Sequence, residues 1–256
     1  MLGKAREITP KLIAWRRDFH RHPELGFQEI RTAGQMAAIL ENLGCQVRTS
    51  VGKTGLVAEL GSGKPVIAIR ADMDALPILE ANENEYASET PGVMHACGHD
   101  AHLAIALGAA ALLSQEEFPG TVRFLIQPSE EVADREGLSG APRMIADGAM
   151  QGVDWVIALH VDPITPVGQI RINAGPFSGG VDSFFATING TGGHGARPHE
   201  GVDPIYITGL VLLALHGIVS RRLDPVAPAV VSALARSVAL HVHSSHNSHS
   251  APASCP

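Results

Sequence analysis

Four segments of this 256-residue chain place potential metal ligands beside predicted strands or at the start of a predicted helix. The runs PVIAIRA and TVRFLIQ are apolar enough for buried strands, DWVIALH is a further apolar strand, and the loop MHACGHD precedes a long apolar helix. In an open α/β sheet, ligands bind beyond the carboxyl ends of the strands. We therefore expect one metal-binding edge, to which the segments contribute Asp72 and Asp74, then Cys97, His99, Asp100 and His102, then Glu130 and Glu131, and finally His160.

Helical periodicity separates several of the strand-like runs. Apolar spacing predicts helices over residues 8–22, 29–43, 101–114 and about 140–149, with Gly44 capping the second of them. Two further runs, CQVRTSV and GLVAEL, are β-rich. Strands that alternate with helices indicate an α/β fold, here with a mostly parallel sheet flanked by helices on both faces.

The character of the chain changes near Gly175. The loop GPFSGG is followed by VDSFFATING, which alternates like a half-exposed strand, and by the apolar helix PIYITGLVLLALHGIVSRR. The final residues are rich in Ser, His and Pro and have almost no core residues. We expect an α/β domain over 1–174, the start of a smaller α/β domain over 175–238, and a non-globular tail over 239–256.

Composition and charge exclude several classes of function. The net charge of −7 argues against a nucleic-acid partner, which needs a basic face. No apolar run approaches the roughly 18 residues that span a bilayer, and the N-terminus lacks a signal-peptide pattern. Three cysteines far apart in sequence do not make a disulfide framework, so we expect a cytoplasmic protein with no membrane partner.

The ligand types at the predicted edge favour a borderline metal. A mixture of nitrogen, sulfur and oxygen ligands suits Zn²⁺, or Mn²⁺ or Co²⁺ in a more oxygen-rich arrangement. Of two adjacent glutamates, one can bind the metal while its neighbour takes a proton from a water that the metal activates. The pattern predicts hydrolysis of an amide or related acyl bond.

Each candidate ligand also has a purely structural interpretation. Asp100 can cap the helix that follows it, and Cys97 alone can be a small buried hydrophobic residue. The pair Glu130 and Glu131 can be a solvated surface, and His160 can be a hydrogen-bonded core histidine. Placement beside a second ligand or directly after a buried strand favours the functional interpretation of Cys97 and of the two glutamates. For Asp100 and His160 both interpretations stay open.

The motifs RRDFHRHPELGFQE, RADMDALP, MHACGHDAH, QPSEE, ALHV and GTGGHGARPHEGVDPI resemble, in order and spacing, those of the peptidase M20 amidohydrolases. The branch they resemble holds hippurate hydrolases, indole-acetyl-amino-acid hydrolases and N-acetyl-diaminopimelate deacetylases. QPSEE departs slightly from the usual QPAEE. The resemblance covers residues 5 to about 233 and implies a zinc-peptidase-like catalytic domain followed by a lid and dimerisation domain.

The resemblance also implies roles for individual residues. Cys97, His99, Glu131 and His160 match the ligands of a centre with two divalent metal ions, Zn or Mn, with Co or Ni also compatible. Glu130 matches the general base, and Asp72 matches a catalytic carboxylate that orients the site. His194 matches a lid histidine that stabilises the tetrahedral oxyanion; neighbouring glycines give it a tight turn from which to present its ring. The implied partners are a small N-acyl amino acid substrate and a second copy in a homodimer formed through the lid.

Beyond about residue 233 the sequence departs from these motifs. In the family, the chain returns from the lid to finish the catalytic domain and supplies a further histidine ligand, which has no counterpart here. We therefore interpret the chain as resembling a C-terminally truncated amidohydrolase, and expect it to catalyse poorly. The alternatives are an inactive metal-binding or oligomerising remnant, and a metal-storage or chaperone role for the tail histidines His241, His243, His246 and His249.

Overall fold

The computed structural model describes residues 2–175, 180, 182 and 184–233. Its contacts divide the chain into two compact units, 1–168 and 169–256. The predicted tail over 239–256, with its four histidines, lies outside the described residues.

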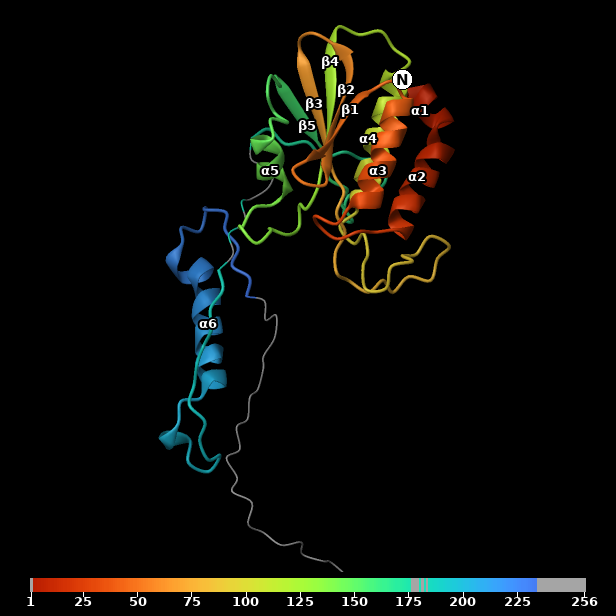
Figure 1. Ribbon diagram of the computed structural model, residues 1–256. Coiled ribbons are helices and arrows are strands. Elements are labelled where there is room, and N and C mark those ends of the chain that lie inside the picture. Colours follow the sequence, from red (N-terminus) through yellow and green to blue (C-terminus); the bar gives the residue numbers. More distant parts are fainter. Residues whose placement is uncertain (1, 176–179, 181, 183, 234–256) are drawn as a thin grey trace, which may run out of the picture. The chain divides into compact units, whose positions relative to one another are not determined.

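A five-stranded mixed sheet forms the centre of the first unit (Figure 1). Its strands follow the order β1-β2-β4-β3-β5. β2 pairs antiparallel with both β1 and β4, whereas β3 pairs parallel with both β4 and β5. The strands are β1 (Gln46–Val51), β2 (Gly55–Ser62), β3 (Val66–Asp72), β4 (Gly120–Gln127) and β5 (Trp155–Ala158).

The prediction of an α/β fold is confirmed, but the prediction of a mostly parallel sheet is wrong for one half of it. β1, β2 and β3 follow one another without an intervening helix. A short turn can join antiparallel neighbours, whereas parallel neighbours need a crossover connection of a dozen or more residues. Crossover connections that contain helices join β3 to β4 and β4 to β5. These three strands form the parallel half of the sheet.

Four helices lie on one side of the sheet and a short fifth helix lies on the other (Figure 1). The main core joins Phe19 and Met36 on two of these helices to Leu107 on a third and Phe124 on β4. The helices are α1 (Leu2–Glu7), α2 (Thr9–Arg21), α3 (Ile30–Asn42), α4 (His99–Leu113) and α5 (Gly140–Ala146). The predicted helices are thus present, although α4 begins two residues earlier than expected and α5 is shorter. Gly44, with φ of 89°, follows α3 in the left-handed conformation common after helix ends.

The edge strand β5 is uncovered within the described first unit. Trp155 and Ile157 are 69% and 57% exposed, and Val156 between them is 48% exposed. The strand that the sequence predicted here is confirmed, but the expected cover on both faces of the sheet is absent from β5 among the described residues. Strands in parallel sheets are normally covered on both faces, so β5 presents an apolar surface beside the predicted site.

Gly140, at the start of α5, packs directly against the backbone that leads to the two glutamates. A Cβ at this position would lie 1.7 Å from the carbonyl oxygen of Pro128. We expect Gly140→Ala to destabilise the fold by about 3 kcal/mol, because backbone atoms must move to relieve the overlap. Gly34→Ala is the matched control: it lies inside α3 with open space around its Cβ, and should stabilise by about 0.5–1 kcal/mol. Urea unfolding of both variants checks this, and equal effects would contradict it.

The second unit is dominated by helix α6 (Pro204–Arg222), with a short 3₁₀ helix, η1 (Pro198–Glu200), before it. Asp203 caps α6, because its side chain accepts hydrogen bonds from the amides of Ile205 and Tyr206. The predicted helix is confirmed. The predicted strand over VDSFFATING is absent from the residues described there, and the nearest β pairing is one bridge between Thr191 and Val202.

By length and composition alone, α6 could cross a membrane, and it is not buried within its unit. The expectation that no apolar segment approaches that length is therefore wrong for this helix. One such helix is weak evidence for a membrane protein, since core helices of soluble proteins meet the same criteria.

Candidate metal centre

The ends of β3, β4 and β5 and the start of α4 bring the predicted ligands together in the first unit. Candidate ligand atoms of Cys97, His99 and His160 all lie within 4.8 Å of one another. The same holds for His99, Glu130 and Glu131. The two triads share His99, so the other three predicted ligands and the predicted base surround its buried imidazole.

Both histidine side chains direct the same ring nitrogen toward the cluster. Nδ1 of His99 donates to the carbonyl oxygen of Asp74 (2.8 Å), and Nδ1 of His160 donates to that of Val161 (2.6 Å). Nε2 of His99 is buried and has no hydrogen-bond partner among the described residues. Nε2 of His160 lies 3.4 Å from Sγ of Cys97. A carbonyl on Nδ1 leaves Nε2 free as a ligand atom, as is usual for histidines that bind metals.

The chemistry of the donor set fits a divalent borderline ion. Nε2 of His99 lies 3.8 Å from Oε1 of Glu131, and the thiol of Cys97 is close to both His160 and Glu131. Imidazole nitrogen, thiolate sulfur and carboxylate oxygen together match the ligands that Zn²⁺ takes in proteins. The orphaned nitrogen of His99 is the atom that such an ion would satisfy.

Acidic groups crowd the same cluster. Burial raises the pKa of the Cys97 thiol to about 12, and the hydrogen bond and charge of Glu131 add to the effect. Burial, followed by the charges of Glu131 and Asp72, raises the pKa of Glu130 above its ordinary value. Like charges this close disfavour one another's ionised forms. A cation bound among these groups would relieve that repulsion.

Asp72 is buried and faces other side chains of the site. Burial opposes its ionisation, but the hydrogen bond from His102 and the charges of His99 and Arg70 outweigh that and lower its pKa to about 2. Oδ1 lies 2.6 Å from Nδ1 of His102, and Oδ2 lies 2.5 Å from Arg70. Asp72 is therefore a carboxylate whose direct partners are a histidine and an arginine.

His194, the predicted oxyanion donor, belongs to the second unit. It is exposed, and its Nδ1 accepts a hydrogen bond from the amide of Ala196 (3.1 Å). Gly193 and Gly195 flank His194 in the chain, as predicted. The role of His194 stays a prediction.

Two buried groups behind the cluster were missed by sequence reasoning. Glu29 is fully buried and accepts from the amide of Ser129 (2.8 Å) and from the hydroxyl of Thr54 (2.5 Å). It thereby fixes the backbone just before Glu130. Its place in the motif GFQE, 100 residues from its partner, gave the only available signal.

The second missed group surrounds Asp100. Gly98, not Asp100, precedes the first residue of α4, and no side chain caps that helix. The Asp100 carboxylate instead accepts from His20 (2.7 Å) and pairs with Arg16 (2.8 Å). Asp100 is therefore a buried ion-pair partner, which is neither a helix cap nor a member of the ligand triads.

Beside Asp100 lies His95, buried at 3% exposure, whose two ring nitrogens have no hydrogen-bond partner among the described residues. Burial lowers its pKa to about 4, although the charges of Asp100 and Asp74 oppose the shift. The unfolded chain takes up this proton below about pH 6.5, whereas the folded chain resists it down to about pH 4. Acidification through that window should therefore cost the fold about 3 kcal/mol.

The change that checks this is His95→Leu, which removes the titrating ring. We expect the variant to lose much less stability than the wild type between pH 6.5 and pH 4. Urea unfolding with a chelator present at several pH values measures it, and His22→Leu, at a half-buried histidine outside this cluster, is the control. An unchanged pH dependence in His95→Leu would contradict the assignment.

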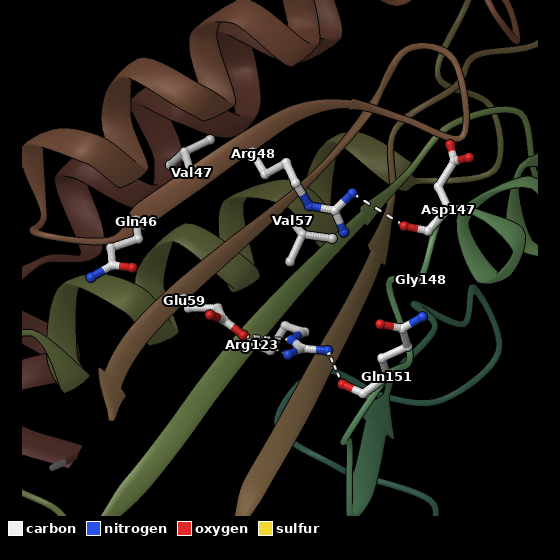
Figure 2. A pocket seen from close by; sticks show the side chains of 9 residues that line it. All are labelled: Gln46, Val47, Arg48, Val57, Glu59, Arg123, Asp147, Gly148 and Gln151. Carbon is white, nitrogen blue, oxygen red and sulfur yellow. Dashed lines mark hydrogen bonds and ion pairs between the residues drawn. The ribbon is translucent and has the colours of Figure 1, made fainter. Parts of the chain in front are cut away.

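A hollow of about 520 Å³ lies elsewhere on the sheet, beside β1 and the end of α5 (Figure 2). Its arginines are already engaged: Arg123 pairs with Glu59, and Arg48 donates to the carbonyl oxygen of Asp147. Because the hollow contains no group of metal ligands, we place the candidate site at the strand ends.

The fold is an α/β fold with a mixed sheet, and its candidate metal centre lies beyond the ends of the strands. The chain belongs to peptidase family M20/M25/M40, whose sequence profile matches residues 68–256. The alignments to individual relatives cover 87–90% of the chain, which agrees with the expected extent of the resemblance.

Similar proteins agree with this assignment. The chain is 46% identical to the N-acyl-L-amino acid amidohydrolase of Geobacillus stearothermophilus over 88% of its length. A solved structure from methicillin resistant Staphylococcus aureus gives a TM-score of 0.70 and 36% identity, covering 88% of this chain and 60% of that one. The Bacillus subtilis YXEP protein, a dinuclear metal-binding peptidase of the M20 family, gives a TM-score of 0.58 and 43% identity. The match covers 64% of this chain and 46% of that one.

The chain spans only part of these relatives. Its match covers 61% of the Geobacillus protein and 58% of a cyanobacterial relative from Synechocystis.

Proposed function

We propose that this chain carries the metal centre of an amidohydrolase that cleaves the amide bond of N-acyl amino acids. The observation that supports this most is the pair of ligand triads sharing His99. Nε2 of His99 can bind one divalent ion, and a second ion, as in the dinuclear Bacillus subtilis relative, would be held by the remaining thiolate, imidazole and carboxylate ligands; Zn²⁺ or Mn²⁺ fits, with Co²⁺ or Ni²⁺ compatible. The substrate class follows from similarity to the Geobacillus N-acyl-L-amino acid amidohydrolase.

Different residues of the chain have different roles in such a hydrolysis. Bound divalent ions supply Lewis acidity, which polarises the carbonyl and acidifies water. Cys97, His99, Glu131 and His160 hold the ions. Glu130 takes a proton from the attacking water and returns it to the leaving amine, a role that needs a carboxylate within hydrogen-bond reach. The resemblance assigns His194 the donation to the developing oxyanion, which in dimeric relatives it makes in the site of a partner subunit.

The second candidate is a metal-binding or oligomerising protein without catalytic activity. The exposure of His160, Glu130 and the neighbouring strand β5 favours it, because the described first unit leaves this side of the centre open. A homodimer formed through the second unit and a location in the cytoplasm belong to the proposal for the complete enzyme.

Metal analysis of the purified chain, followed by assays on a panel of N-acyl amino acids, tests the proposal. We expect up to two equivalents of a divalent ion and preference for N-acyl amino acids over unblocked peptides. Metal binding without hydrolysis of any panel member would favour the non-catalytic candidate. No metal binding at all would contradict the amidohydrolase and leave only an oligomerising protein.

A further inference from the structure

The start of α4 holds the segment that carries His160. The amide of Val161 donates to Nε2 of His102 (3.0 Å). The side chain of Val161 also packs against Gly98, where a Cβ would lie 2.4 Å from its Cγ2. Gly98 has a φ of 86°, which L side chains rarely adopt. Two residues near the start of α4 therefore fix the position of the residue that directly follows His160.

This contact determines the tautomer of His102. A backbone N–H can only donate, so Nε2 of His102 must accept and carries no proton. The proton sits on Nδ1, which donates to Oδ1 of Asp72 (2.6 Å). Oδ2 of Asp72 faces Arg70 (2.5 Å), which keeps the carboxylate ionised. His102 and Asp72 are 2% and 1% exposed, so water does not compete for these bonds.

His102 is consequently unsuited to bind an ion itself. Its ligand atom and those of Asp72 and His99 lie within 4.8 Å of one another, which is the spacing of a metal site. Both of its ring nitrogens, however, are committed to other groups. Its ring instead packs edge-to-face against the ring of His160, with centroids 4.6 Å apart.

We propose that His102 is a positioning residue, which places His160 for metal binding through the Val161 amide while Asp72 fixes its tautomer. The inference rests on the proposed metal centre and deepens it. It changes the expected role of Asp72, which acts through His102. The link joins β3, α4 and the segment after β5, so His160 is held against Cys97 before an ion arrives.

Three variants test the proposal. His102→Leu removes the acceptor, whereas His102→Gln keeps an oxygen that can reach the Val161 amide. Asp72→Asn presents an amide N–H to Nδ1 of His102 and so favours the tautomer that carries its proton on Nε2. That proton would face the N–H of Val161, and the hydrogen bond between them would be lost. Groups that orient metal ligands change metal affinity by about 10- to 100-fold. We expect that loss for the Leu and Asn variants, and recovery of most of the affinity in Gln.

Two measurements on the whole chain provide the readout. Titration with Co²⁺, followed by the thiolate-to-cobalt absorption band of Cys97, gives the metal affinity. Hydrogen exchange of the Val161 amide in metal-free protein reports the hydrogen bond directly, and should be faster in Leu and Asn than in wild type and Gln. His22→Leu, outside this network, is the control and should match wild type in both measurements.

The outcomes separate this proposal from the proposed function. Unchanged Val161 exchange in His102→Leu would overturn the positioning role, and so would a Gln variant that binds Co²⁺ as weakly as the Leu variant. A wild-type chain that binds no Co²⁺ would overturn the metal centre and, with it, any effect of His102 on metal binding. In that case the exchange data would still show whether the hydrogen bond exists.

Discussion

Glu130→Gln is expected to lower the rate of amide hydrolysis by about 10²- to 10⁴-fold while leaving the metal content nearly unchanged. General base catalysis contributes roughly this factor, and glutamine cannot accept the proton. The metal should stay, because Glu131 approaches Nε2 of His99 and can serve as the ligand. The measurements are kcat with an N-acyl amino acid and metal content by elemental analysis.

Glu131→Gln is the matched control for this prediction. It makes the same replacement of one carboxylate oxygen by an amide NH₂ in the neighbouring residue, but should lose metal together with activity. A Glu130→Gln variant that keeps a near wild-type rate, or that loses its metal, would show that the two glutamates have been assigned the wrong way round. If the present chain proves too slow to assay, the hybrid described next carries the same pair of variants.

The chain alone is expected to hydrolyse N-acyl amino acids at least about 100-fold more slowly than a hybrid that continues with the remaining part of the Geobacillus relative. In the described first unit, His160 and Glu130 are exposed and β5 is uncovered, so water reaches the centre and one ligand is incompletely enclosed. Misplacement of reacting groups by about 1 Å can cost roughly 100-fold. A covered site also strengthens the electrostatic interactions inside it.

The comparison uses metal-loaded preparations of both chains with the same substrate panel. Exposed Trp155 provides an independent control for correct assembly, because its fluorescence should shift to shorter wavelength when β5 is covered. Comparable rates in the two chains would show that the present chain holds a complete site, and would contradict this prediction.

Much of the candidate site could be predicted from the sequence, because its signal is local. CGHD places Cys97 and His99 at the start of an apolar helix, and Glu130, Glu131 and His160 each follow a β-rich run. Helical periodicity located α2, α3 and α6 to within a few residues, since an amphipathic or apolar pattern at spacing 3.6 needs no knowledge of distant residues.

The pairing of strands could not be predicted in the same way. Alternating strands and helices suggested a mostly parallel sheet, but the sheet order places β2 beside β4 and gives half of it antiparallel pairing. The order of strands in a sheet depends on contacts between residues that are distant in the sequence, which the local pattern does not contain. The apolar pattern of DWVIALH likewise predicts a strand, but whether β5 is covered depends on what packs against it.

The sequence by itself determined the family of this protein, the residue types of its candidate metal centre and the helices that frame it. Only the tertiary structure decided how those residues are used. It assigns Asp100 to His20 rather than to a helix cap, joins Glu29 to Ser129, and commits both nitrogens of His102. The physical reason is that hydrogen bonds depend on distance and direction in space, and these partners lie 30 to 100 residues apart in the chain.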